Sequence, residues 1–212
     1  MKLEKFLIAN NAFQNEKELY KFARYKTLQQ FYNCCERPEW LIWLFARTNP
    51  HNSKEIILTA VKCANLLSHL VKRKVLLKAL SASLYFEKYC NDNLSELVKI
   101  RDAAWDHQNG QLANKNRDGQ IANKVAFLSI EAAHAFGFTD YVASNAMEIA
   151  ELLQKTYKTK DILHLVREQL PFKIWNKKAI RYVKKSVYDR YYEHRNEHLP
   201  SNSEIFKQLT KK

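Results

Sequence analysis

The sequence predicts an all-α protein: a single antiparallel bundle of about eight or nine helices with a basic C-terminal helix. Three observations lead to this fold class. Apolar residues recur at intervals of three and four over long stretches, which is the period of an amphipathic helix. The 212 residues include only three Gly and four Pro, too few for the tight turns of an all-β protein. Hydrophobic residues make up 46%, enough for a sizeable core without disulfides or metal.

The first expected helix runs from Glu16 to Cys35. Its apolar positions are Leu19, Tyr20, Phe22, Ala23, Leu28, Phe31 and Tyr32. A short second helix is expected from Pro38 to Ala46, because proline suits a first turn, where its missing N–H would be unpaired. This helix ends before Pro50, which restrains Asn49 away from the helical backbone conformation.

The third, fourth and fifth helices are expected over residues 53–70, 74–91 and 93–107. Ser53 is the expected N-cap of the third helix, since its hydroxyl can accept an N–H of the first turn. All three have apolar faces, formed by residues such as Ile56, Val61, Leu77, Leu80, Leu97 and Ile100.

Residues 107–120, HQNGQLANKNRDGQ, are expected to form a surface loop, because they contain Asn-Gly and Asp-Gly and little that could be buried. Two helices follow over residues 121–135 and 139–157, separated by Gly137, with Thr139 as the expected N-cap of the second. A short helix over residues 160–169 stops before Pro171. Alanines spaced through the middle helices would allow a close approach between them.

The last expected helix, residues 177–198, has two distinct faces. Ile180, Val183, Val187 and Tyr191 fall on one side and predict a docking stripe. The neighbouring cationic face is the predicted partner-binding surface: Lys177, Arg181, Lys184, Lys185, Tyr188, Tyr192 and Arg195. Residues 173–212 contain 11 Lys and Arg against 4 Asp and Glu, more than half of the net charge of +13. We therefore expect a helical bundle domain over residues 1–172 and a basic helical extension over residues 173–212.

Residues 34–47, CCERPEWLIWLFAR, form a bulky apolar segment in an otherwise basic chain. On a helix, Trp40 lies near Trp43 and Leu44, one turn further on, so the three side chains share one face. We interpret this face as bracing the core between longer helices, in preference to lining a ligand pocket.

Four segments resemble the helical, alanine-rich immunity proteins of bacterial toxin–immunity systems. They are the early Cys35, Trp40, Trp43 and Leu44; the helix AVKCANLLSHL; the alanine-rich helices from Ala122 to Ala150; and ILHLVREQLPF, with Ile162, Val166, Arg167, Pro171 and Phe172. The resemblance covers residues 30–173. It implies an all-helical protein that binds and neutralises a toxin without chemistry of its own, and it supplies no toxin-contacting residues.

Three patterns have catalytic or metal-ligating content. HRNEH, residues 194–198, fits the zinc motif H-x-x-E-H, but few residues follow to supply the further carboxylate ligand, so a solvated helix end is preferred. Glu131 and His134 form a single Glu-x-x-His, half of what a di-iron bundle requires. Asp102, Asp106 and His107 lie close in sequence without a Ser or Cys nucleophile in register, which favours a capped or ion-paired helix.

The cysteine and glycine positions exclude several other site types. Cys34, Cys35, Cys63 and Cys90 contain no CxxC pair, so buried free thiols are expected rather than a zinc ligand set or a disulfide framework. With glycines only at positions 110, 119 and 137, no Walker-type loop or G-x-G-x-x-G is possible. The sequence therefore predicts a protein that is not an enzyme and has no cofactor and no metal.

No apolar run is long enough for a membrane span or a signal-peptide core, so we expect a cytoplasmic protein without a membrane partner. The expected function is to sequester a toxin or another bacterial effector. The expected partner is a protein with an acidic surface, because charge complementarity raises association rate and selectivity. Two alternatives stay open for the cationic helix. It could bind nucleic acid, as in an accessory protein or an inhibitor of a nucleic-acid-guided defence enzyme, or it could be a plain solvated face.

Overall fold

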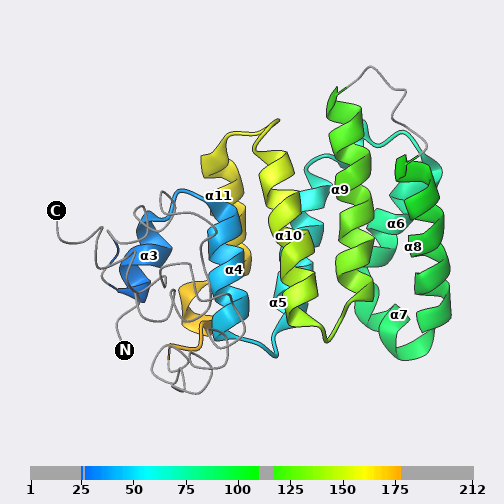
Figure 1. The fold of residues 1–212 in the computed structure, drawn as a ribbon. Helices are drawn as coiled ribbons and strands as arrows, with labels where there is room; N and C mark the ends of the chain where they lie inside the picture. Colours follow the sequence, from blue (N-terminus) through cyan, green and yellow to red (C-terminus); the bar gives the residue numbers. More distant parts are fainter. Residues whose placement is uncertain (1–24, 26, 110–116, 178–212) are drawn as a thin grey trace, which may run out of the picture. The chain divides into compact units, whose positions relative to one another are not determined.

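The computed structural model describes Tyr25 and residues 27–109 and 117–177 (Figure 1). In these residues all regular structure is helical, with nine α-helices, two 3-10 helices and no strand, which confirms the all-α fold class. No helix in the described ranges is both long and apolar enough to cross a membrane. The chain divides into two units, residues 36–175 and the two chain ends, 1–35 with 176–212.

The element bounds follow the predicted order closely. The α-helices are α3 (Leu28–Cys34), α4 (Pro38–Thr48), α5 (Ser53–Asn65), α6 (Lys74–Leu84), α7 (Phe86–Asp92), α8 (Leu94–Asn109), α9 (Arg117–His134), α10 (Thr139–Leu153) and α11 (Thr159–Gln169). The 3-10 helices are η1 (Ser68–Leu70) and η2 (Phe172–Ile174). Of these described helices, α3 belongs to the unit of the chain ends and the others belong to residues 36–175.

Within residues 36–175, α9 and α10 are the central helices. Helix α10 packs against α4, α5 and α9, and α9 packs also against α6 and α8 (Figure 1). Small side chains allow this close approach, because the alanines of both helices that face neighbours are fully or almost fully buried: Ala122, Ala126, Ala132, Ala133, Ala143, Ala146 and Ala150. Larger side chains fill the spaces between helices, among them Leu41, Ile42, Phe45, Ile56, Leu76, Leu97 and Ile130.

The predicted first helix, residues 16–35, is not continuous. Thr27 is extended, with φ −131° and ψ 157°, and its hydroxyl accepts the backbone N–H of Gln30 at 3.1 Å, so α3 begins only at Leu28. Tyr25 lies outside the helix and donates its O–H to the carbonyl of Cys34 at 3.0 Å. Residues 16–24 lie outside the described part of the chain.

Ser53 and Thr139 are not the N-caps that the sequence predicts. Each is the first residue of its helix, after Asn52 and Phe138 respectively. Their hydroxyls join the two helix starts instead: Ser53 Oγ accepts the backbone N–H of Gly137 at 3.2 Å, and Thr139 Oγ1 donates to the Pro50 carbonyl at 2.6 Å. The pair of bonds ties the α4–α5 turn to the α9–α10 turn.

Substituting Thr139 by valine keeps the shape of this buried side chain and removes the O–H. We expect Thr139→Val to lower the free energy of unfolding by about 1 kcal/mol, the usual net contribution of one hydrogen bond. The matched control is Thr156→Val, since Thr156 is exposed. Urea unfolding of the three proteins checks this, and equal stabilities would contradict the tie between the turns.

Three predicted segments have different bounds in the structure. The helix expected over residues 53–70 ends at Asn65 and is followed by the separate 3-10 helix η1. The helix expected over residues 74–91 breaks at Tyr85, and the change of direction allows Phe86 to be buried with its ring 5.4 Å from that of Phe136. The loop expected over residues 107–120 is helical at both ends, because α8 continues to Asn109 and α9 starts at Arg117. Residues 110–116 lie outside the described ranges.

Candidate partner interface

The predicted cationic face lies almost entirely outside the described residues. Lys177 is described; it is exposed and follows η2. The other six members, Arg181, Lys184, Lys185, Tyr188, Tyr192 and Arg195, lie beyond residue 177, as do the HRNEH histidines.

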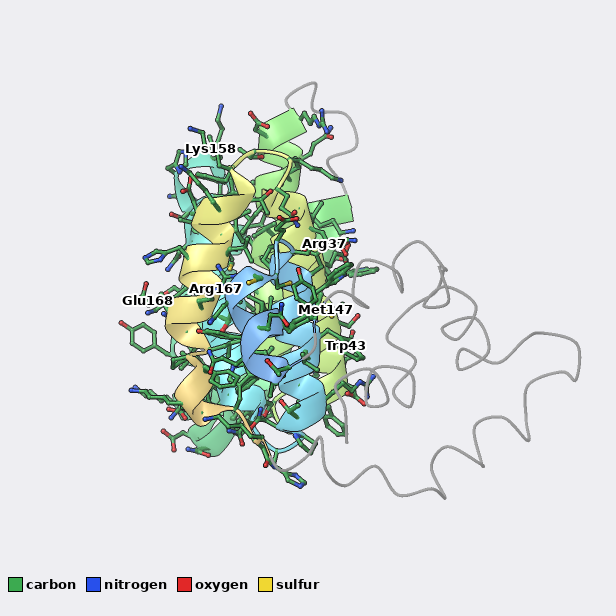
Figure 2. All side chains as sticks on the ribbon, turned by 90° about the vertical axis from the view of Figure 1, so that its left-hand side faces the viewer. Arg37, Trp43, Met147, Lys158, Arg167 and Glu168 are labelled. Carbon is green, nitrogen blue, oxygen red and sulfur yellow. The ribbon has the colours of Figure 1, made fainter. Side chains whose placement is uncertain are left out.

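The two tryptophans of α4 are partly exposed to solvent and are not fully buried in the core. Leu44 is fully buried, whereas Trp40 and Trp43 are each only partly buried. A guanidinium covers each indole: Arg37 lies 4.7 Å from the Trp40 ring centroid and Arg47 lies 6.0 Å from that of Trp43. Leu41, Ile42 and Phe45 of the same helix are fully buried in the core. Figure 2 shows Arg37 and Trp43 along α4 at this surface.

Polar contacts fix this part of α4 onto α10. Glu39 is buried and is paired with Arg37, and it also accepts the side-chain N–H of Gln154 at 3.0 Å. At the other end of α4, Arg47 pairs with Asp140 at 2.9 Å. A carboxylate that is removed from water needs such partners. Both described partners of Glu39, Arg37 and Gln154, lie where α4 begins and α10 ends.

A second surface brings together aromatic side chains that the sequence analysis did not select. Trp105 of α8, Phe138 before α10 and Tyr141 of α10 have exposed fractions of 52%, 74% and 53%. Arg101, one helical turn before Trp105 on α8, contacts Glu131, which in turn bonds to Tyr141. We call these four residues, with Phe138 at the start of α10, the α8–α10 surface. The Trp105 ring packs edge-on against Phe127 of α9 at 5.2 Å, which anchors the outer side chain to a buried one.

Arg101 is held at the centre of the α8–α10 surface. Its guanidinium contacts Asp102 at 2.5 Å and Glu131 at 3.8 Å, and it donates to the ring of His134 at 3.1 Å. Glu131 also accepts the O–H of Tyr141 at 3.0 Å. Side chains of α8, α9 and α10 are therefore fixed to one another before any partner arrives.

The electrostatics of this cluster follow from the position of Arg101. Burial, and then the positive charge of Arg101, lower the pKa of His134 below its usual 6.5, so the ring is neutral at neutral pH and accepts from the guanidinium. The hydrogen bond to Glu131 is the main reason that the pKa of Tyr141 lies above 10.0, because it stabilises the protonated phenol.

The same contacts decide between the site hypotheses for Glu131 and His134. Both residues face the guanidinium of Arg101, a fixed positive charge that would repel a metal ion from this pair. In the described part of the chain no group of three His, Cys, Asp or Glu side chains is placed to hold a metal ion. Asp102 contacts Arg101, and His107 contacts Arg73 at 3.1 Å, so the structure does not bring Asp102 and His107 together as a pair.

The four cysteines are free thiols with different environments. Cys35 and Cys63 are buried, Cys90 is partly buried, and Cys34 is exposed, contrary to the expectation that all four are buried. Burial raises the pKa of the Cys63 thiol from 9.0 to about 12. Because only the thiolate reacts, Cys63 is inert at neutral pH.

We expect a thiol reagent at pH 8 to label Cys34 rapidly and to label Cys63 only after unfolding in urea, as read by mass spectrometry of peptides. Since the pKa of the folded Cys63 lies above its unfolded value, its contribution to stability is present below pH 9 and is lost as the pH rises toward 12. Cys63→Ala should therefore lose stability less steeply in that range. Rapid labelling of Cys63 in the folded protein would contradict its burial.

The sequence contains one hint of the α8–α10 surface, the pair of aromatic residues that flank Gly137. That glycine has a φ of +94°, in the region that glycine adopts most easily, so the turn between α9 and α10 is short and leaves Phe138 outside the core.

Comparison of the chain with protein-family models, curated proteins and solved structures gives no match.

Proposed function

We propose that this chain is a non-enzymatic, cytoplasmic binding protein that neutralises a bacterial toxin or another effector by sequestering it. The observation that carries the proposal is the α8–α10 surface, where the exposed Trp105 and Tyr141 accompany an arginine that is already fixed in place by Glu131 and His134. The resemblance of residues 30–173 to helical immunity proteins agrees with this function.

The residue types of the α8–α10 surface support a protein partner. Trp, Tyr and Arg are the side chains that contribute most often to the binding energy of protein interfaces. Trp105 and Phe138 expose large apolar surfaces to water. A partner that covers them removes this apolar surface from water, which favours binding. The bonds from Arg101 and Tyr141 to Glu131 reduce the side-chain entropy that would be lost on binding.

The charge distribution supports an acidic surface on the partner. Residues 1–35 and 176–212 together carry 16 Lys and Arg against 7 Asp and Glu, a surplus of nine out of the net charge of +13. A positive surplus of this kind raises the rate of association with an acidic protein, and this rate enhancement decreases as the salt concentration rises. We also propose that the chain forms a single antiparallel bundle that ends at residue 172 and is followed by a basic helix.

The same surplus favours a second candidate, a nucleic-acid-binding accessory protein or an inhibitor of a nucleic-acid-guided defence enzyme. Here the cationic helix, with Lys177, Arg181, Lys184 and Lys185, would contact phosphates, and its tyrosines would stack on unpaired bases. Changing these four residues to Glu should then abolish nucleic-acid binding and leave a protein partner bound.

The experiment that tests the first proposal is recovery of the tagged full chain from nuclease-treated cell lysate, with the bound proteins identified by mass spectrometry. We expect a stoichiometric, nuclease-resistant partner. Trp105→Ala/Tyr141→Ala should weaken its binding at least about 100-fold, because truncating each of two central aromatic residues should cost at least about 1.4 kcal/mol, which is tenfold in affinity.

The matched control is Leu77→Ala/Leu94→Ala, which shortens two apolar side chains of similar exposure, 41% and 50%, outside the α8–α10 surface. It should retain the partner. If both double variants lose the partner equally, or both retain it, the α8–α10 surface is not the contact site.

A further inference from the structure

Two turns at one end of the unit formed by residues 36–175 carry only positive charge. Residues 66–74, LLSHLVKRK, contain Lys72, Arg73 and Lys74, and residues 154–160, QKTYKTK, contain Lys155, Lys158 and Lys160. Neither segment contains an Asp or a Glu. We call these two segments the basic turns.

The basic turns are joined to each other. Tyr157 donates its O–H to the carbonyl of Leu66 at 2.6 Å, which places the α10–α11 turn against the chain that leaves α5. Both turns lie at the upper end of the helices in Figure 1, and Figure 2 shows Lys158 at that end, just before α11. Arg73 in turn contacts His107 near the end of α8, so the positive charge extends toward a third helix.

The lysines of the basic turns have no acidic partner. Lys72, Lys74, Lys155, Lys158 and Lys160 are exposed, and none of them forms an ion pair with any residue that the structure describes. Elsewhere in the same unit, Lys54, Lys62, Lys78 and Lys124 are each paired with a glutamate. Three other exposed lysines of this unit, Lys88, Lys99 and Lys173, also form no ion pair with a described residue, but they lie far apart in the sequence. The basic turns differ because they hold five such lysines in two segments that are joined to each other.

Helix stability does not explain these positions. Lys72, Arg73 and Lys74 surround the start of α6, and Lys158 and Lys160 surround the start of α11. The dipole of a helix disfavours cations at its N-terminus, so these residues reduce the local stability instead of raising it.

The geometry points to the phosphate backbone of nucleic acid as the ligand of the basic turns. Lysines on flexible stems, in two adjacent segments that contain no Asp or Glu, suit a repeating row of phosphates, with Asp161 as the acidic residue that follows directly. A protein partner fits less well, because none of the exposed large apolar residues lies in either turn and lysine is depleted from protein interfaces. The basic turns contain none of the residues of the α8–α10 surface or of the predicted cationic face.

The test is binding of the full chain to a fluorescein-labelled duplex DNA of random sequence, measured by anisotropy between about 50 and 200 mM salt. The variant is Lys72→Gln/Lys155→Gln/Lys158→Gln. Its matched control, Lys88→Gln/Lys99→Gln/Lys173→Gln, removes the same charge from three exposed lysines outside the basic turns.

We expect the slope of log K against log salt to fall by about 2 to 3 in the variant, since each phosphate contact contributes about 0.9, and to change by less than about 1 in the control. Equal changes in both proteins would overturn the assignment, as would a wild-type chain that does not bind the duplex. Loss of a nuclease-resistant protein partner from the lysine variant, with DNA binding intact, would also overturn it.

The outcome is separable from that of the proposed function. Trp105→Ala/Tyr141→Ala should bind the duplex with the wild-type slope, because neither residue lies in the basic turns. Loss of DNA binding in that double variant would contradict the separation of the two surfaces.

Discussion

Trp175→Ala is expected to lower the free energy of unfolding by about 3–5 kcal/mol, the usual cost of removing a buried aromatic ring. Trp175 is 3% exposed, and its indole N–H donates to the Leu170 carbonyl at 2.9 Å. Its ring packs edge-on against Phe45 of α4 at 5.7 Å and lies 6.1 Å from Phe172. The side chain therefore fastens the segment after α11 onto α4.

Urea unfolding of Trp175→Ala and of two comparison variants measures this effect. Trp175→Phe keeps most of the ring contacts and loses the N–H donor, so it should cost about 1 kcal/mol. Trp105→Ala removes a tryptophan that is half exposed and should cost clearly less than Trp175→Ala. A Trp175→Ala protein as stable as Trp105→Ala would show that the segment after α11 does not close the core.

Arg101→Met is expected to lower the free energy of unfolding by about 1–3 kcal/mol, because it removes hydrogen bonds to charged groups and leaves the mostly buried Glu131 without its cation. It should also raise the pKa of His134, since the positive charge of Arg101 is one of the two causes that lower it. Both effects come from one guanidinium that joins α8 to α9.

The raised pKa of His134 in Arg101→Met should change how the stability depends on pH. In the wild type the pKa of folded His134 lies below its unfolded 6.5, so the associated stability is present above pH 6.5 and is lost as the pH falls through the folded pKa. Arg101→Met should show a smaller loss in that range, with the His134 titration followed by NMR.

Arg73→Met is the matched control for Arg101→Met, because Arg73 also donates to a histidine, His107, but at an exposed position. It should change stability by less than about 0.5 kcal/mol. Equal losses of stability in the two variants, or a His134 pKa that does not rise in Arg101→Met, would contradict the role of Arg101.

The helices themselves could be predicted from the sequence, because their period is written in the apolar positions. The helix expected over residues 139–157 is observed as Thr139–Leu153, and the one expected over residues 160–169 as Thr159–Gln169. Helix starts were harder: Ser53 and Thr139 are good capping residues, yet their hydroxyls bond to another turn, and only tertiary structure determines that choice.

Surface exposure could not be predicted from periodicity. Trp40 and Trp43 share an apolar face with Leu44, but only Leu44 is fully buried. The two indoles are partly exposed, and arginine guanidinium groups lie over their rings. Phe138 directly precedes α10 and Tyr141 lies in its first turn, and the exposure of both depends on where the α9–α10 turn lies. The break of the helix at Tyr85 also depends on a distant residue, Phe136, which packs against Phe86.

We propose that this chain neutralises a target by stoichiometric binding through the α8–α10 surface. The most direct measurement is the activity of the recovered target, titrated with purified wild-type chain and with Trp105→Ala/Tyr141→Ala. We expect inhibition by the wild type to reach its end point at one chain per target, and the double variant to need at least about 100-fold more protein. A target that stays fully active with excess wild-type chain, or is inhibited equally by both proteins, would contradict it.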